Sequence, residues 1–569
     1  MFAMLVSFHS VRDEEKRKLR SLFERSEGSP IIEWSDETVY LVRLNVEALT
    51  SYSGVMKLDD NGVSVLAGQT LIEGGDDTET GHKLLCDALK NNDVSTLSTA
   101  SGTFCCAVYE KSVSGGGGCV TLVTDKIGIR PIYIYRGSKC YVIASALNII
   151  ERFSDGDLKP DFLGITQRLA LGYPVGERTE YVEVDCIRSA GIVKINRDGI
   201  NTSTYFDWGS ITANNLSIEE NARIAYELFS TAVARRTNGD KAVAASLSGG
   251  LDSRCVVGAL RASECQVVCL NRSDPKSKNY VYAEMLAKRL SCPFHGLPKG
   301  DGVWFRKYLA GYLRDLNTAS EIQLDRPRVL WSGDGGSVGA GAVHLDAEML
   351  AAARTHGDRF GVELLIERNG YQPSGKKIFS REYRSQVQEL YVESLLTEMQ
   401  RITCEDRGNA LFLFLLLNDQ RRHMEDIYEH MDLWKIDYNM PFYDGDFCSH
   451  LFSVPIDQRL RHVFYNTWLK FFPDPVHNTP WQVYPGHEGH QMGLDDEQEL
   501  LDQWRTKSTA ASNKNVTSRA RELSEVMNRQ SRDSPISKFR TFFWGMFHVL
   551  GIRDYTRLFR ISDTYNRYY

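Results

Sequence analysis

Features typical of membrane, secreted and nucleic-acid-binding proteins are missing from this sequence of 569 residues. No run of about 18 apolar residues is present, so we expect no membrane-spanning helix. The first residues, MFAMLVSFHSVRDEEKRKLR, lack a basic leader, a long apolar region and a small-residue cleavage site, so we expect no secretion signal. The net charge of -7 gives no reason to expect nucleic acid as a partner. These absences indicate a cytoplasmic protein.

Metal-binding and disulfide spacings are also missing from the 12 cysteines. They are scattered between Cys86 and Cys448, and no CxxC pair occurs. Several of them, such as Cys105, Cys106 and Cys269, lie in apolar runs that resemble strands. We therefore expect buried, reduced thiols rather than disulfides or zinc ligands.

Residues 1–205 are predicted to form a β-rich domain. The chain is too long for one hydrophobic core, and this first part contains short β-branched or aromatic runs bounded by turn residues. The runs are Thr38–Leu44, Gly62–Leu66, Gly102–Glu110, Val120–Thr124, Ile132–Tyr135 and Tyr141–Ala144.

Residues 215–500 show a different pattern, in which strands and helices alternate. Ser217 and Glu220 form a predicted capping box at the start of the first helix. The βαβαβ order that follows predicts a parallel sheet with helices on both faces, and the remainder is mostly helical. The predicted strands are Ala242–Leu247, Gln266–Leu270 and Arg328–Trp331, and the predicted helices are Ser253–Leu260 and Val281–Leu290.

Residues 510–569 form a basic, aromatic and helical extension. From Asn515 to Tyr569 there are 10 Arg or Lys residues against 5 Asp or Glu residues, and the segment FRTFFWGMFHVLGI is too short to span a bilayer. Two interpretations stay open: a helix that packs on the body of the protein or on a protein partner, and a helix that lies on a membrane surface.

The segment Ser248–Ser253 carries the strongest chemical signal. It reads SGGLDS and lies between an apolar strand and the start of a helix. Gly249 and Gly250 allow backbone N–H groups to approach phosphate oxygens, and the helix N-terminus adds partial positive charge. Asp252 offers a hard oxygen ligand for the Mg²⁺ that accompanies ATP. No GxxxxGK[ST] loop occurs, so Walker-type chemistry on a γ-phosphate is not indicated.

The segment SLSGGLDSR resembles the pyrophosphate loop of the asparagine-synthetase family. Trp331–Gly336 resembles the family's second nucleotide-and-substrate segment, and Met440–Asp444 resembles its "PFLD" segment. Three upstream segments resemble landmarks of the glutamine-amidotransferase domain: Gly102–Phe104, Asp125–Tyr133 and Ala144–Leu147. The similarity covers roughly residues 1–500.

This resemblance implies an α/β protein with two kinds of domain. The first is an N-terminal-nucleophile (Ntn) hydrolase-like β-sandwich with αββα layers, and the second is an adenine-nucleotide α-hydrolase-like parallel-sheet domain with added helices. The implied activity uses ATP and Mg²⁺ to adenylate a carboxylate, with release of pyrophosphate, and then transfers the acyl group to an amine. The carboxylate and the amine belong to two substrates or to one molecule or peptide.

The resemblance also assigns site residues. Those implied for ATP and pyrophosphate are Ser246, Ser248, Gly249, Gly250, Leu251, Asp252, Ser253, Leu270, Ser332 and Gly333, with Asp252 as the metal ligand. Asp334 is implied to face the activated acyl group or the amine as a catalytic residue. Asp437 is expected to pair with Asp334 as an acid–base dyad.

The N-terminal domain departs from the family's glutaminases. Those enzymes use an N-terminal cysteine, whereas Phe2 follows the first methionine here. Ala67–Thr70 replaces an "NGE" turn, and Ser101 replaces an aspartate that holds glutamine. We therefore expect a scaffold without glutaminase activity, similar in this respect to β-lactam synthetases and lasso-peptide cyclases.

The synthetase domain departs as well. Ser337 replaces a metal-binding aspartate, and residues 475–486 contain no Lys or Arg where the family has a late lysine. His477 or Lys507 would have to stabilise the charge on the acyl-adenylate instead. Two alternatives to the ligase stay open: a catalytically impaired binding subunit of the same fold, and asparagine synthesis from aspartate and free ammonia.

Overall fold

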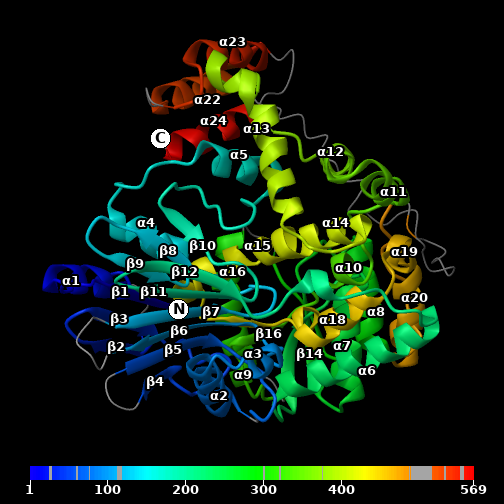
Figure 1. Ribbon diagram of the computed structural model, residues 1–569. Helices are drawn as coiled ribbons and strands as arrows, with labels where there is room; N and C mark the ends of the chain where they lie inside the picture. Colours follow the sequence, from blue (N-terminus) through cyan, green and yellow to red (C-terminus); the bar gives the residue numbers. More distant parts are fainter. Residues whose placement is uncertain are drawn as a thin grey trace. The chain divides into compact units, whose positions relative to one another are not determined.

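A computed structural model describes most of the chain, in two compact units (Figure 1). Unit 1 consists of residues 1–155, 187–347 and 424–505, and unit 2 of residues 156–186, 348–423 and 506–569. The described residues are 1–24, 28–58, 62–75, 77–111, 118–298, 302–319, 322–373, 376–485, 487, 516–530, 534–550 and 556–568. All the predicted site residues belong to unit 1, and the predicted domain boundaries stay a prediction. None of the described helices has the length and apolar character needed to cross a membrane.

Unit 1 contains two antiparallel sheets. In the first, the strands of unit 1 follow the order β8-β9-β1-β3-β2, and the second has the order β12-β11-β7-β6-β5-β4. The first sheet consists of β1 (Phe2–Val6), β2 (Ile31–Ser35), β3 (Val39–Leu44), β8 (Tyr133–Arg136) and β9 (Tyr141–Ala144). The second consists of β4 (Val55–Leu58), β5 (Gly62–Gly68), β6 (Phe104–Glu110), β7 (Cys119–Thr124), β11 (Gly191–Asn196) and β12 (Gly199–Thr204).

The two sheets pack face to face and helices cover their outer faces. Alternate residues along each strand, such as Phe2 and Met4 on β1 or Val63 and Val65 on β5, fill the layer between the sheets. Contacts place α1 (Asp13–Ser21) and α4 (Leu147–Ser154) against the first sheet and α2 (Thr78–Asn91) and α3 (Val94–Ser98) in the layer of the second. The predicted αββα sandwich is confirmed.

The parallel sheet of unit 1 has the order β15-β14-β13-β16-β17. Its strands are β13 (Ala242–Ser246), β14 (Gln266–Asn271), β15 (Phe294–Gly296), β16 (Val329–Trp331) and β17 (Asp437–Asn439), and its helices include α6 (Ile218–Thr237), α7 (Asp252–Ala262), α8 (Lys278–Arg289) and α9 (Gly302–Ala319). Val243 and Ala245 face the core formed with α6 and α7, whereas Ala244 faces the core formed with α9. Helices thus cover both faces, as predicted, and the Ser217–Glu220 capping box is present.

Unit 2 is helical. It contains α5 (Phe162–Leu171), α12 (Asp358–Asn369), α13 (Arg381–Gln400), α14 (Arg407–Leu415), α22 (Val516–Arg529), α23 (Lys538–Val549) and α24 (Thr556–Tyr568). Tyr565 of α24 is fully buried against Ile165 of α5, so the C-terminal extension packs within this unit. Phe539, Phe542 and Phe543 of α23 remain exposed, by 76%, 50% and 47% respectively. The extension therefore packs through one face and leaves aromatic side chains for a contact that stays a prediction.

Candidate nucleotide site

The predicted loop lies at the switch point of the parallel sheet, where the strand order along the chain reverses. The chain enters the sheet at β13, adds β14 and β15 on one side, and later adds β16 and β17 on the other. In such sheets a crevice forms at the carboxyl ends of the two strands that flank this switch point, which here are β13 and β16. Ser248–Ser253 follows β13 and Ser332–Asp334 follows β16, so both predicted segments meet at this edge.

Two serines close the loop after β13. The Ser248 N–H donates to the Ser253 Oγ at 2.8 Å, and the two hydroxyl oxygens lie 3.0 Å apart. The Gly250 N–H donates to the Ser248 Oγ at 3.3 Å. Leu251 occupies the N-cap of α7 and has no side-chain acceptor for the first-turn N–H groups. The helix therefore begins with the arrangement that suits a bound anion.

Glycines allow this loop to contact its neighbours closely. A Cβ on Gly249 would lie 2.7 Å from the Asn279 Cα, and the Gly249 N–H donates to the Asn279 Oδ1 at 2.5 Å. A Cβ on Gly333 would lie 2.7 Å from the Asp252 carbonyl carbon. Both glycines are required by these close approaches: Gly249 lets the first loop contact α8, and Gly333 lets the second loop contact the start of α7.

Hydroxyl groups surround the Asp252 carboxylate. The Ser337 Oγ lies 2.8 Å from both carboxylate oxygens, and the Tyr465 hydroxyl donates to Oδ1 at 2.9 Å. Burial raises the pKa of Asp252 to about 6 and the negative charge of Asp334 adds to this effect, whereas the bonds from Ser337 and Tyr465 oppose it. The donor atoms are all oxygens, the ligand type that Mg²⁺ prefers, so this set fits the predicted metal.

Asp334 lies beside this carboxylate. It is partly buried, and the Ser332 hydroxyl donates to its Oδ2 at 2.5 Å. Ser246 and Leu270 complete the same edge of the sheet. The Ser246 Oγ donates to the Trp331 carbonyl at 3.2 Å, and the Leu270 carbonyl accepts from the Leu247 N–H at 2.9 Å. The structure thus brings the predicted loop residues and Asp334 together.

The predicted dyad of Asp334 and Asp437 is wrong. Asp437 begins β17 and pairs with Val329, the first residue of β16, whereas Asp334 follows the last residue of β16. At about 3.3 Å per strand residue, the two carboxylates belong to opposite ends of the sheet. The Asp437 Oδ1 instead accepts from the Arg130 Nη2 at 2.5 Å, and both side chains are buried. The family resemblance suggested a catalytic role for Asp437, but a buried ion pair with Arg130 occupies its carboxylate.

Arg254, which sequence reasoning missed, ties a distant segment to the loop. Its guanidinium is fully buried and donates to the Gly250 carbonyl at 2.8 Å. It also donates to the carbonyls of Val476, Thr479 and Pro480 at 2.9, 2.7 and 2.9 Å. Burial lowers the pKa of Arg254 to about 10, so it stays charged at neutral pH. The final R of SLSGGLDSR was the available signal.

The residues expected to replace the late lysine are placed as follows. His477 lies in α21 (Asp474–Asn478), where its Nδ1 is 3.1 Å from the Asn478 Oδ1. Lys507 lies outside the described residues. Residues 479–482 reach the loop by their backbone, since the Gln482 N–H donates to the Gly249 carbonyl at 2.9 Å. The structure therefore brings this region to the loop without a lysine.

A second histidine, His462, lies against Tyr465, whose hydroxyl contacts Asp252. His462 is buried, and its ring lies 5.6 Å from that of Tyr465, 5.8 Å from that of Tyr484 and 4.5 Å from that of His487, measured between centroids. Burial lowers the pKa of His462 to about 3, so its ring is neutral at working pH. No lysine-like positive charge comes from this group.

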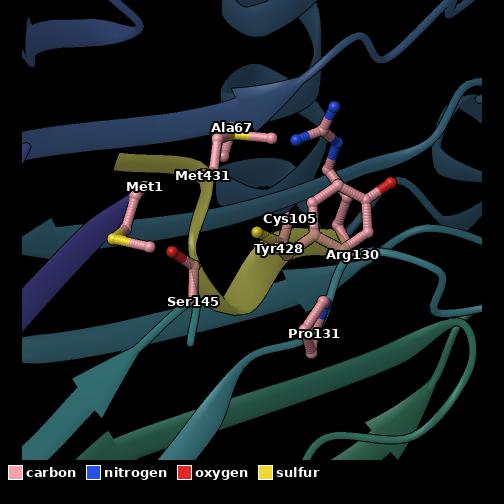
Figure 2. A pocket seen from close by; sticks show the side chains of 8 residues that line it. All are labelled: Met1, Ala67, Cys105, Arg130, Pro131, Ser145, Tyr428 and Met431. Atoms are coloured by element: carbon pink, nitrogen blue, oxygen red, sulfur yellow. The ribbon is translucent and has the colours of Figure 1, made fainter. Parts of the chain in front are cut away.

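A small cavity lies beside the first residue of the chain, next to β5 and β6. Figure 2 shows the side chains around it, which are Met1, Ala67, Cys105, Arg130, Pro131, Ser145, Tyr428 and Met431. The cavity measures about 10 Å³, which is room for about one water molecule. Burial raises the pKa of Cys105 to about 12, so this thiol stays protonated. Phe2 is fully buried between the sheets and offers no nucleophile.

Comparisons with known proteins agree with the architecture of this site. Residues 225–297 match the asparagine synthase family model, a span that runs from α6 through β15 and includes the loop. No curated protein sequence matches the chain. Two solved structures are distantly similar. One is the glutamine phosphoribosylpyrophosphate amidotransferase from B. subtilis complexed with ADP and GMP, with 12% identity, a TM-score of 0.25 and coverage of 60% of this chain and 77% of that chain.

The other is described as the allosteric regulatory enzyme of purine biosynthesis, with 11% identity, a TM-score of 0.25 and coverage of 58% of this chain and 74% of that one. Such TM-scores carry no information about the activity of this protein. The family match is different, because it covers the strand, loop and helix that form the site. Residues 225–297 are therefore similar to the asparagine synthase family in the part of the chain that carries the loop.

Proposed function

We propose that this protein is an ATP- and Mg²⁺-dependent ligase that adenylates a carboxylate and transfers the acyl group to an amine. The observation that carries the proposal is the meeting of two loops at the switch point of the parallel sheet. There the N-terminus of α7, the glycine-rich loop and the Asp252 carboxylate all lie at one edge. This combination suits a nucleotide whose pyrophosphate is the leaving group.

The loop residues have distinct proposed roles. Backbone N–H groups and hydroxyls of Ser248–Ser253 bind the pyrophosphate, while Leu270, Ser332 and Gly333 border the adenosine. Asp252 holds Mg²⁺, and the hydroxyls of Ser337 and Tyr465 orient its carboxylate. When bound, the metal ion neutralises negative charge on the departing pyrophosphate.

Asp334 is the proposed general base. An amine is protonated at neutral pH and must lose a proton before it attacks the adenylate. Asp334 stands on the loop that contacts α7, and the Ser332 hydroxyl fixes its position at 2.5 Å. Because Asp437 pairs with Arg130, we assign this role to Asp334 alone.

The amine does not come from glutamine in this proposal. The cavity of about 10 Å³ is too small for a glutamine side chain, and the protonated Cys105 is the thiol beside it. The nucleophile is therefore an amine of a second substrate or of the same molecule. Proximity within the closed site favours that amine over water as the attacking group.

Isotope exchange between pyrophosphate and ATP tests the proposal. We expect exchange with at least one member of a broad panel of carboxylates, including peptides and amino acids, and none with Asp252→Asn. Asp198→Asn, at an exposed turn, is the matched control and should exchange like the wild type. Absence of exchange across the panel, despite measurable binding of ATP·Mg²⁺, contradicts the ligase.

That negative outcome would favour a catalytically impaired binding subunit. The absence of Lys and Arg from residues 475–486 is the observation that supports this second function. Exchange with aspartate followed by formation of asparagine from free ammonia would support asparagine synthesis instead. The panel therefore distinguishes all three functions.

A further inference from the structure

A buried group of metal-ligating side chains lies between α2 and the second sheet, away from the nucleotide site. His82 and Cys86 are four residues apart on α2 and therefore share one helical face. Cys106 lies on β6, beneath that face. Their ligand atoms all lie within 4.8 Å of one another, and all three residues are buried. We propose that His82, Cys86 and Cys106 bind a Zn²⁺ ion that fastens α2 to the sheet.

The orientation of His82 suits this role. Its Nδ1 lies 2.9 Å from the Tyr52 hydroxyl, and its Nε2 lies 3.8 Å from the Cys106 Sγ. When Nδ1–H donates to Tyr52, Nε2 carries the lone pair and lies 2.6 Å from the Ser64 Oγ and within 4.8 Å of both sulfur atoms. Metal-binding histidines usually have this arrangement, in which a second group fixes the ring through the other nitrogen.

Ser64 of β5 supplies a fourth donor. Its Oγ lies 2.6 Å from the His82 Nε2, 3.1 Å from the Cys86 Sγ and 3.5 Å from the Cys106 Sγ, and the residue is fully buried. Zinc bonds of about 2.0–2.3 Å at tetrahedral angles separate neighbouring ligand atoms by roughly 3.3–3.8 Å. The observed distances bracket this range, so small side-chain rotations are enough to admit the ion.

The charge of the ligands and the softness of their sulfur atoms favour Zn²⁺ over Mg²⁺ or Ca²⁺. Two thiolates cancel the charge of one Zn²⁺, and a neutral imidazole adds none, so the loaded site has no net charge. This matters because the surrounding layer is apolar, with Leu66, Leu85 and Phe104 as neighbours in the same core. Thiolate and imidazole ligands select zinc, whereas Mg²⁺ and Ca²⁺ need oxygen ligands. A closed site of this kind stabilises the fold.

Sequence patterns did not predict this site, because only the His82–Cys86 spacing is local. Cys106 comes from a strand that follows α3, and the Ser64 hydroxyl comes from a strand that precedes α2. In the structure all twelve cysteines are free and ten are buried, whereas Cys119 and Cys140 are only partly buried. Zinc binding would change the interpretation of two of them.

The test uses the purified full-length chain. We expect about one zinc equivalent per chain by elemental analysis after incubation with Zn²⁺ and dialysis. Replacement by Co²⁺ should give the visible absorption bands and the thiolate charge-transfer band of a tetrahedral site. Cys86→Ser and Cys106→Ser should each reduce the bound metal at least tenfold. Cys119→Ser, at a partly buried position on β7, is the matched control and should leave it unchanged.

A second measurement, on the wild-type protein, tests the proposal even if the cysteine variants do not fold. A chelator should lower the thermal midpoint of the wild-type protein, and added Zn²⁺ should restore it. A wild-type protein that binds no metal, or metal retained in the double variant of Cys86 and Cys106, would overturn the proposal. A disulfide between these two cysteines in protein purified under reducing conditions would overturn it as well.

Discussion

Replacing Asp252 with asparagine should separate a functional carboxylate from a structural one. In the nucleotide-free protein, burial raises the pKa of Asp252 from 3.8 to about 6. The folded protein therefore binds this proton more tightly than the unfolded chain, and the charged form costs the folded state stability at neutral pH. A shift of about two units corresponds to roughly 3 kcal/mol.

Asparagine removes this cost and keeps the shape of the side chain. Asparagine has one acceptor oxygen fewer for the hydroxyls of Ser337 and Tyr465. The lost hydrogen bond offsets roughly 1–2 kcal/mol of the gain in stability. We therefore expect Asp252→Asn to be more stable than the wild type by about 1–2 kcal/mol near neutral pH when a chelator is present. The same variant should lose Mg²⁺-dependent binding of ATP.

The pH dependence provides an internal check. As the pH falls through about 6, the wild-type carboxylate gains its proton and loses the penalty, whereas the variant does not titrate. The wild type therefore regains roughly 2–3 kcal/mol by pH 4, so the stability difference should shrink, pass through zero and reverse in favour of the wild type. Thermal unfolding at several pH values and calorimetric titration of ATP·Mg²⁺ measure both effects, with Asp198→Asn as control. A variant that is less stable than the wild type at neutral pH and binds ATP·Mg²⁺ normally would refute this reasoning.

Four further predictions follow from the packing and the chemistry. Gly333→Ala should lower the thermal midpoint and the ATP affinity, because its Cβ meets the backbone of α7; the expected loss of stability is about 1–3 kcal/mol. Gly250→Ala is the milder control, because its Cβ would lie 3.4 Å from the nearest atom. Asp334→Asn should keep pyrophosphate exchange and lose amide formation, and equal loss of both would place it on the nucleotide. Asp437→Asn should cost about 3–5 kcal/mol of stability by leaving Arg130 unpaired, yet keep exchange per folded molecule; a stable variant without exchange would restore a catalytic role. The wild type should release no glutamate from glutamine above a heat-treated control, and measurable release would contradict an inactive pocket.

Local patterns predicted the elements that carry their own signal. The capping box of Ser217 and Glu220 marks the first residue of α6, and apolar runs mark β13 and β14 to within one residue. The short strands β15 and β17 have three residues each and were not predicted. The equally short β16 was predicted because all its residues are apolar, whereas β15 and β17 contain polar residues and show no apolar run.

The site shows the same division between local and distant information. The loop after β13 was predictable because all its residues are consecutive. Its supporting side chains were not, because Arg254 acts on carbonyls more than 200 positions away, and Tyr465 reaches Asp252 from α20 (Val463–Leu469). The prediction for Asp437 failed for the opposite reason. Its sequence context suggested a catalytic role, whereas its partner Arg130 lies in the β-rich N-terminal part of the chain.

The Arg130 side chain links the antiparallel sandwich to the parallel sheet within unit 1. The Arg130–Asp437 pair joins residues that a domain boundary would separate, and both groups are buried. In the same unit, Glu429 accepts from the backbone N–H groups of Leu147 and Asn148 at 2.8 and 2.9 Å, so it caps α4 from a distant helix, α16 (Glu425–Glu429). Burial raises the pKa of Glu429 to about 7, which shows how costly its charge would be without those donors. Removal of residues 1–155 would take away the partners of Asp437 and Glu429 and expose the surface that the sandwich covers. The sandwich is therefore part of the structure that supports the parallel sheet, because side chains on and before β17 depend on partners within it.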